Sequence, residues 1–230
     1  MKNKKILTDW LLNYIPTFLC AILILYFAIA RKQHFIHTLP TLVTLAVQLL
    51  LVIADRRAFL LGGTNAIVYG ISYLYQNLYF SMFSAFFISA PMQYFSFFRW
   101  RHGTKKEGTP LHFMPWYKLL LCLVATLAAW GLMLLCAYSL FESAAYPTLD
   151  ALIFVLGITV TILAAFGYVE SQYLNIVNSL IALALYILRT GDDPAFMNYL
   201  IISFYNLFRV AQASVNWTLL YRKTKRETAA

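Results

Sequence analysis

Residues 149–168 read LDALIFVLGITVTILAAFGY and residues 170–188 read ESQYLNIVNSLIALALYIL, with only Val169 between them. Each stretch is long enough for one membrane crossing, because a helix needs about 20 apolar residues to traverse the hydrocarbon of a bilayer. The single intervening residue leaves no room for a soluble segment. The two stretches therefore predict a tight helical hairpin that crosses the membrane twice.

The same kind of apolar run recurs along the whole chain, which is 61% hydrophobic and 12% charged. Soluble domains usually carry about 25% charged residues, so lipid is the expected solvent. Runs of the required length lie near residues 10–30, 36–54, 58–76, 78–98, 115–138, 149–168, 170–188 and 195–220. The sequence predicts an all-α membrane protein of about eight transmembrane helices.

The net charge of +9 indicates membrane topology and not a nucleic-acid partner. Lys and Arg are retained on the cytoplasmic side of membrane helices. If the N-terminus is inside, most of the 18 Lys and Arg residues lie in cytoplasmic segments, and only Arg31, Lys32 and Arg189 lie outside. We therefore expect both termini in the cytoplasm and no binding of nucleic acid.

A weak internal repeat divides the chain. Asn65 precedes Tyr73 by the same interval at which Asn178 precedes Tyr186. Three helices and one linking helix give the second triplet the orientation of the first, and parallel repeats place a substrate site near the midplane between the halves. The predicted parts are an extra N-terminal helix (1–35), a first three-helix repeat (36–101), a cytoplasmic loop with a linking helix (102–148), a second three-helix repeat (149–222) and a basic cytoplasmic tail (223–230).

Polar side chains gather in the two repeats at depths where they are costly unless they pair or face a cavity. Any single amide is also explained as interhelical glue, which contributes about 0.6 kcal/mol on average, but the whole set favours a polar cavity. Amides suit an uncharged or heterocyclic substrate because they both donate and accept hydrogen bonds. The predicted substrate-binding residues are Asn65, Tyr69, Gln93, Gln172, Tyr173, Asn175, Asn178, Asn206 and Arg209.

Two positions within the spans carry further expectations. Pro91 removes a helical hydrogen bond from the fourth span and is a candidate hinge. Arg209 lies near the middle of the last span, with Glu170 as one candidate partner. If Arg209 lines the cavity unpaired, it favours an anionic or neutral substrate over a cation. A purely structural role for Arg209 is the equal alternative.

Motifs for catalysis, ATP binding and metal binding are missing from the sequence. The three cysteines, Cys20, Cys122 and Cys136, lie inside apolar runs without metal spacing and are expected to be structural thiols. The histidines fall on both predicted sides of the membrane and cannot form one site. We expect no enzyme activity, no cofactor and no metal site.

Residues 62–100, GGTNAIVYGISYLYQNLYFSMFSAFFISAPMQYFSFFRW, resemble the first repeat of PnuC-type vitamin transporters. Residues 150–189 resemble the second repeat, including Y-V-E from Tyr168 to Glu170. The resemblance implies an architecture similar to the SWEET sugar transporters and a place in the bacterial inner membrane. It also implies facilitated diffusion of a B-vitamin precursor or nucleoside by alternating access, followed by phosphorylation that traps the substrate inside the cell.

The resemblance leaves several substrates open. Nicotinamide riboside is the family default, and thiamine, riboflavin and deoxynucleosides are alternatives. Members that carry nicotinamide riboside typically have W-x-x-W after the Glu that opens the seventh helix, whereas this chain has Gln172 and Asn175 there. A hypothesis of another class is a non-transporting membrane scaffold, whose amides would pair with each other and leave no cavity. A homo-oligomer is compatible with either function.

Overall fold

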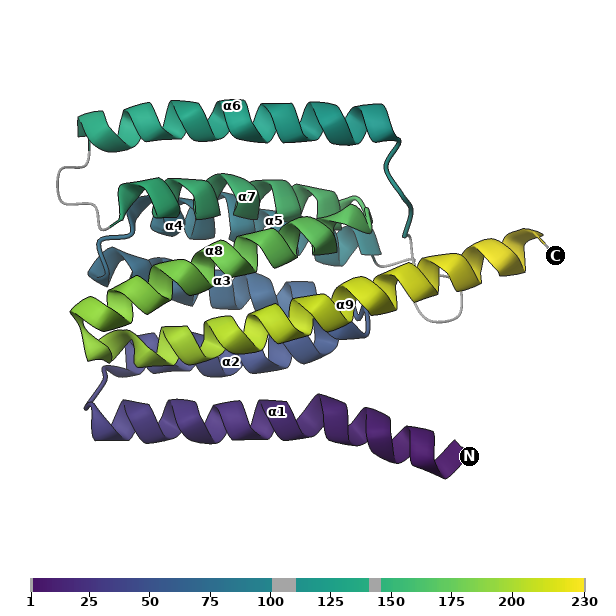
Figure 1. The fold of residues 1–230 in the computed structure, drawn as a ribbon, viewed down its shortest axis with the longest axis horizontal. Helices are drawn as coiled ribbons and strands as arrows, with labels where there is room; N and C mark the ends of the chain where they lie inside the picture. The colour runs from purple at the N-terminus through teal and green to yellow at the C-terminus, as the bar shows by residue number, and fades with distance from the viewer. Residues whose placement is uncertain (1, 101–110, 141–145, 230) are drawn as a thin grey trace.

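The computed structural model describes residues 2–100, 111–140 and 146–229, and this part of the chain is built from helices. The helices lie roughly side by side, and α1 begins at the same end of the bundle at which α9 ends (Figure 1). We call this end the terminal end. The opposite end, which holds the α3–α4 and α8–α9 connections, is the far end. The predicted all-α fold is confirmed.

The helices follow the predicted order. The first three are α1 (Lys2–Ala30), α2 (Phe35–Val52) and α3 (Arg57–Tyr75). The fourth span is composite, with α4 (Tyr79–Phe83), a π-helical turn η1 (Ser84–Ser89) and α5 (Ala90–Arg99). The remaining elements are α6 (Trp116–Leu140), α7 (Pro147–Ala165), α8 (Glu170–Asp192), the 3₁₀ turn η3 (Pro194–Phe196) and α9 (Met197–Ala229).

The boundaries differ from the prediction mainly at the two ends of the chain. Helix α1 begins at Lys2, several residues before the predicted start of the first span. Helix α9 continues to Ala229 and includes most of the predicted basic tail. The central part of the predicted cytoplasmic loop, residues 101–110, lies outside the described residues.

Within the described residues, five helices are long and apolar enough to cross a membrane: α1, α2, α6, α7 and α8. The other predicted spans are α3, the composite α4–η1–α5 and α9. Helix α3 is rich in Gly and Tyr, the composite span is divided by η1, and α9 carries several polar residues, such as Asn198, Asn206 and Gln212. Polar residues alone do not set the two groups apart, because α8 is among the five although it carries Gln172, Asn175 and Asn178.

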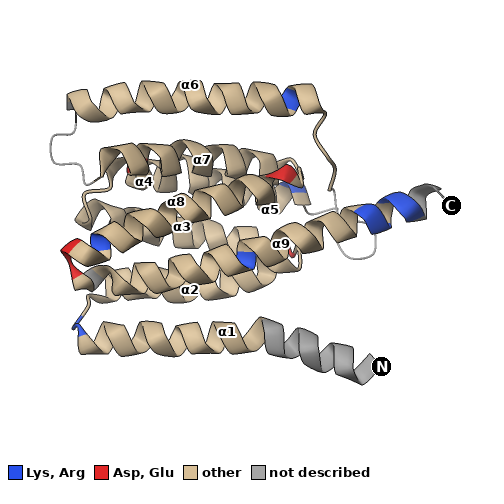
Figure 2. Cartoon of the chain, viewed as in Figure 1, with Lys and Arg blue, Asp and Glu red and all other residues tan. Residues whose placement is uncertain are grey.

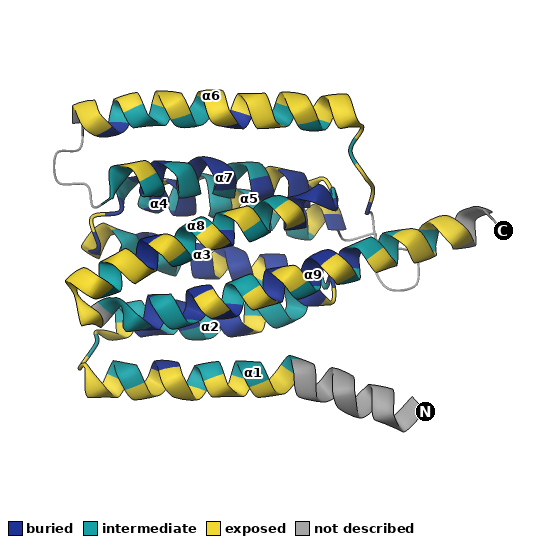
Figure 3. Cartoon of the chain, viewed as in Figure 1, coloured by how far each residue is buried: buried dark blue, intermediate teal, exposed yellow. Residues whose placement is uncertain are grey.

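Six spans form a closed ring of contacts. Around the ring, α2 contacts α3, α3 contacts α5, α5 contacts α7, α7 contacts α8, α8 contacts α9, and α9 returns to α2. Helix α6 packs on α7, and α1 packs on α2 and α9. Figure 3 shows that α1 and α6 are largely exposed while the ring helices carry most of the buried positions. The ring therefore encloses the interior of the protein, and α1 and α6 flank it.

Charged residues gather at the ends of the helices (Figure 2). The middle of the bundle holds few charges among the described residues, and Arg209 of α9 is the fully buried basic side chain there, with an exposed fraction of 0%. This distribution matches a bundle whose ends contact water and whose middle contacts hydrocarbon.

Candidate functional site

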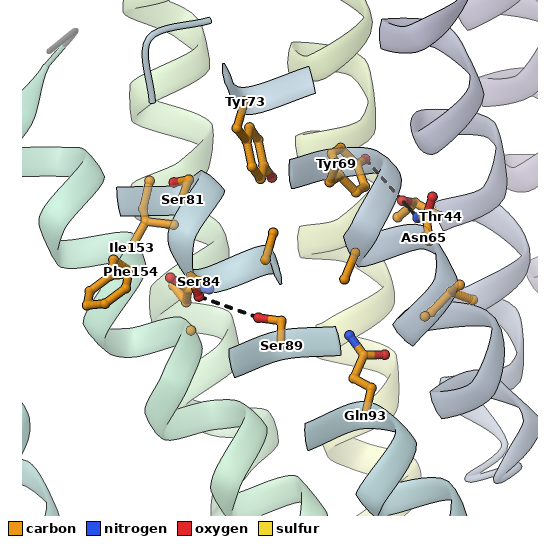
Figure 4. Close-up of a pocket in the computed structure, with 16 residues that line it drawn as sticks. Thr44, Asn65, Tyr69, Tyr73, Ser81, Ser84, Ser89, Gln93, Ile153 and Phe154 are labelled. Carbon is orange, nitrogen blue, oxygen red and sulfur yellow. Dashed lines mark hydrogen bonds between the residues drawn. The ribbon is translucent and has the colours of Figure 1, made fainter. Parts of the chain in front are cut away.

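A cavity of about 240 Å³ lies at mid-height in the bundle, between the composite span, α2, α3, α7 and α8. The described side chains that line it include hydroxyls, amides and aromatic rings, and none of them is charged. Figure 4 shows these side chains converging from both sides of the space. The polar and aromatic lining residues are Thr44, Asn65, Tyr69, Tyr73, Ser81, Ser84, Ser89, Gln93, Phe154 and Asn178.

Helix α3 supplies one wall of the cavity. Asn65, Tyr69 and Tyr73 follow steps of four residues and therefore share one face of the helix. The rings of Tyr69 and Tyr73 are stacked, with centroids 5.4 Å apart. The Tyr69 hydroxyl is 3.0 Å from Thr44 Oγ1 of α2. The wall thus combines a flat aromatic surface with hydroxyl groups held in place by α2.

The amide nitrogen of Asn65 is held by two hydrogen bonds, while its amide oxygen has no donor. Nδ2 donates to Thr44 Oγ1 at 2.9 Å and to the carbonyl oxygen of Pro40 at 3.1 Å. The Oδ1 atom is buried and accepts no hydrogen bond from the described residues. Asn178 of α8 also carries a buried Oδ1 without a protein donor. A buried acceptor left without a donor costs about 1–3 kcal/mol, so a ligand donor that reaches either of these oxygens from the cavity would remove this cost.

The π-helical turn η1 shapes the opposite wall. Its residues Ser84 and Ser89 both line the cavity, with their hydroxyl oxygens 3.4 Å apart. Pro91 follows directly in the first turn of α5. Because proline lacks the N–H and its ring clashes with the carbonyl four residues earlier, an ordinary α-helical turn is disfavoured at this point. The wider π turn accommodates the proline, and π turns are frequent at functional sites.

A close approach of α3 to α5 positions the Gln93 amide. The Gln93 side chain lines the cavity and passes over Gly62, where an added Cβ would lie 1.9 Å from Oε1. Only glycine allows this contact, because any larger residue at position 62 would occupy the space of the Gln93 amide.

Replacing Gly62 with alanine is expected to displace the Gln93 amide and to weaken substrate binding about fivefold, the equivalent of one hydrogen bond of about 1 kcal/mol. The free energy of unfolding should change little, because a flexible side chain moves and alanine favours the helix over glycine by about 1 kcal/mol. Titration calorimetry and thermal unfolding measure the two effects. Gly131→Ala in α6 is the matched control, since its Cβ meets nothing within 4 Å. Equal binding by both variants would contradict the assigned position of Gln93.

An aromatic and hydroxyl network closes the far end next to the cavity. Tyr199 of α9 stacks on Tyr186 of α8 with ring centroids 5.2 Å apart, and its ring centroid is 6.3 Å from that of Tyr69. The Tyr199 hydroxyl is hydrogen-bonded to Ser72 Oγ, and His37 Nδ1 lies 2.6 Å from the same oxygen. Side chains of α2, α3, α8 and α9 therefore meet at this end.

The terminal end is closed by a packed aromatic core. Trp100 at the end of α5 and Trp217 of α9 have ring centroids 5.4 Å apart, and Phe59 of α3 packs against Trp100 at 5.0 Å. The Trp217 indole nitrogen donates to the carbonyl oxygen of Leu51 at 3.1 Å. Val169, at the start of α8, is fully buried in the same cluster. Side chains of α3 and α9 and the residues that flank α5 and α8 thus meet at this end.

The structure places the predicted site residues in three groups. Asn65, Tyr69, Gln93 and Asn178 line the cavity. Four others lie elsewhere on α8 and α9: Gln172 is buried in the first turn of α8, Asn175 and Asn206 are half-buried, and Tyr173 is 42% exposed with its hydroxyl 2.7 Å from Thr218 Oγ1. Arg209 forms the third group.

Arg209 joins α9 to α1. Its guanidinium donates to the carbonyl oxygen of Asn13, to Asn13 Oδ1 at 3.2 Å, to Thr17 Oγ1 at 2.6 Å and to Gln212 Oε1 at 2.7 Å. It does not line the cavity. The suggested partner Glu170 is wrong, because that carboxylate instead accepts a hydrogen bond from the backbone N–H of Met114 at 2.9 Å. The short chain segment at Met114 runs beside the start of α8, which brings its N–H to the carboxylate.

Asp150 is a buried charged residue beside the cavity that the sequence analysis missed. It lies in the first turn of α7 and is 1% exposed. Its carboxylate accepts hydrogen bonds from Ser81 Oγ, a cavity-lining group, and from the backbone N–H of Phe80 at 3.3 Å. The sequence signal was its position three residues after Pro147, inside a predicted span, where an acidic side chain is costly.

The fold and the site define the class of protein. A ring of membrane-spanning helices around a polar, aromatic-lined cavity at mid-height is the arrangement of a transporter. The sequence model of the family described as nicotinamide mononucleotide transporter matches residues 34–218. The chain belongs to this family, and it is a transport protein and not an enzyme.

A solved structure supports the same fold. The chain is similar to the crystal structure of the vitamin B3 transporter PnuC, with a TM-score of 0.78 and 16% sequence identity over 92% of each chain. The family match and this structural match together confirm the resemblance to PnuC-type transporters. The sequence matches none of the curated proteins with which it was compared.

Proposed function

We propose that this protein carries a B-vitamin precursor or nucleoside across the bacterial inner membrane by facilitated diffusion, with nicotinamide riboside as the leading substrate. The observation that carries the proposal is the mid-height cavity. It is lined by Asn65 and Asn178, whose buried amide oxygens have no protein donor, and no described lining side chain is charged. Such a site suits a molecule that is rich in hydroxyl or amide donors and has a flat ring.

The uncharged lining favours the riboside over the phosphorylated nucleotide named in the family description. A phosphate group is normally bound by Arg or by several charge-assisted hydrogen bonds. Placing an unpaired phosphate among amides and hydroxyls inside a membrane protein costs several kcal/mol. The same argument explains trapping, because a substrate phosphorylated in the cytoplasm would no longer fit the cavity that admitted it.

Alternating access is supported by the way in which the two halves correspond. If α2, α3 and α5 are matched to α7, α8 and α9, each ring contact maps onto another ring contact, and α1 on α2 corresponds to α6 on α7. Gln93 follows Asn65 by the same interval at which Asn206 follows Asn178. We propose two parallel three-helix bundles, as in SWEET-like transporters, that rock around the cavity with both termini in the cytoplasm and with η1 and Pro91 as the hinge.

A non-transporting scaffold and a transporter differ in how their buried amides are expected to be hydrogen-bonded. In a non-transporting scaffold, the amides would pair with one another, yet two amide oxygens at the cavity accept no bond from the described residues. Thiamine and riboflavin would be carried by the same mechanism. This chain has Gln172 and Asn175 where carriers of nicotinamide riboside typically have two Trp residues. Thiamine therefore remains an alternative substrate to be tested.

Titration of the purified protein with a ligand panel tests the proposal. Nicotinamide riboside is expected to bind with micromolar affinity, and nicotinamide mononucleotide at least about 100-fold more weakly, because its phosphate finds no cationic partner in the cavity. Thiamine, riboflavin and uridine complete the panel. Binding of the mononucleotide as tightly as the riboside would contradict the argument from the lining, and failure of all five ligands to bind the folded protein would contradict the transport function.

A further inference from the structure

Asp150 lies one hydrogen bond behind the far-end wall of the cavity. Ser81, which lines the cavity, donates through its hydroxyl to this carboxylate, so the lone pairs of the Ser81 oxygen are left for the cavity side. Two aromatic side chains, Tyr73 and Phe154, line the same part of the space, and Figure 4 shows Ser81 between them. The far end of the cavity thus combines aromatic faces with a buried acid just behind them.

Two hydrogen bonds and the start of a helix offset part of the cost of burying the Asp150 carboxylate. Each carboxylate oxygen has its own donor, one from Ser81 and one from the backbone of Phe80. The residue also lies in the first turn of α7, where the helix dipole favours a negative charge. Arg189 is the basic residue of this region, but its guanidinium donates to the carbonyl oxygen of Gln76 at 2.9 Å and stacks on a phenylalanine ring.

The geometry points to Asp150 as the residue that makes this site prefer a positively charged ring. This inference rests on the proposed function and adds an orientation to it. The cationic ring of the substrate lies at the far end of the cavity, between Tyr73 and Phe154, and its hydroxyl-rich part reaches toward Ser89 and Gln93.

The preference follows from the low polarity of the surroundings. Charges interact strongly across a few ångströms in a protein interior, because the effective dielectric constant is far below that of water. None of the described lining residues is charged, and Arg189, the basic group that acts on Asp150, does not line the cavity. The faces of Tyr73 and Phe154 attract cations through their ring quadrupoles and add to the effect. Ser81 transmits the polarisation, since its O–H dipole points at the carboxylate and its oxygen faces the ligand.

A pair of ligands that differ in charge but hardly in shape tests this role. Nicotinamide riboside has a cationic pyridinium ring, and its dihydro form has a neutral ring with the same substituents. The wild-type protein is expected to bind the cation about 10-fold or more tightly than the neutral form. If thiamine proves to be the substrate, its neutral deaza analogue takes the place of the dihydro form. A ratio near one in the wild type would overturn the inference and leave the proposed function intact.

Two variants separate charge from shape. Asp150→Asn keeps the size of the side chain and an acceptor for Ser81, and it is expected to lower affinity for the cation about 10-fold while changing affinity for the neutral ligand less than about twofold. Ser81→Ala removes the hydroxyl but keeps the acid, and should retain most of the preference for the cation. A uniform loss for both ligands in Asp150→Asn would show that the residue only joins α7 to α4. If the wild type binds neither ligand of either pair, this inference is overturned; if riboflavin and uridine also fail to bind, the proposed function fails with it.

Discussion

Replacing Asn178 with leucine is expected to weaken substrate binding by at least about 30-fold while the protein remains folded. The Asn178 amide oxygen is buried at the cavity and has no donor among the described residues. A substrate N–H or O–H that loses such an acceptor is left unpaired, at a cost of about 1–3 kcal/mol, and polar sites reject ligands strongly on this basis. Leucine has a similar size and removes a desolvated oxygen, so the free energy of unfolding should be unchanged or higher.

The control for this variant is Asn175→Leu. Asn175 lies on the same helix one turn earlier and is half-buried, but it does not line the cavity. Binding by this variant should stay within about twofold of the wild type, as is common for substitutions outside a contact. Titration calorimetry on both purified proteins provides the comparison. Similar losses in the two variants would shift the site toward the start of α8, where Gln172 and Asn175 lie.

Replacing Arg209 with methionine should have the opposite effect to Asn178→Leu: the stability of the protein should fall, and substrate binding should be preserved. The guanidinium makes hydrogen bonds to Asn13, Thr17 and Gln212, and all of them connect or brace α1 and α9. Interhelical hydrogen bonds in membranes average about 0.6 kcal/mol each, so their joint loss should reduce stability by about 2 kcal/mol and Tm by about 5 °C. Substrate affinity should remain within about threefold, because Arg209 does not line the cavity.

Thermal unfolding followed by tryptophan fluorescence measures the stability change. Arg222→Met, an exposed position further along α9, is the control and should leave Tm unchanged. If Arg209→Met abolished binding at an unchanged Tm, Arg209 would belong to the substrate path.

The sequence predicted the helices well because hydrocarbon imposes a simple length requirement on every span. It also named Asn65, Gln93 and Asn178, which the structure brings to one cavity. It could not separate them from Gln172, which is 1% exposed at the start of α8. Helical spacing shows which side chains share a face, but an amide that faces a neighbouring helix and one that faces a cavity have the same sequence signal.

Asp150 and Arg209 illustrate the same difficulty for charges. The sequence drew attention to Arg209 because it lies in the middle of a span, yet its partners Asn13 and Thr17 come from α1, nearly 200 positions away in the chain. Asp150 attracted no attention because it stands at the edge of an apolar run. Its position beside the cavity depends on the contact between α4 and α7, which no local pattern reveals.

The π turn η1 determines which side chains of the fourth span face the cavity. In a regular α-helix each step of four residues drifts by about 40°, so Ser81, Ala85, Ser89 and Gln93 would spiral away from a common direction. All four nevertheless line the cavity, because η1 holds one residue more per turn and resets the drift. A length difference of a single residue here would rotate everything beyond it by about 100°. Among relatives of this chain, such a difference would change which side chains face the substrate, and not only the length of a helix.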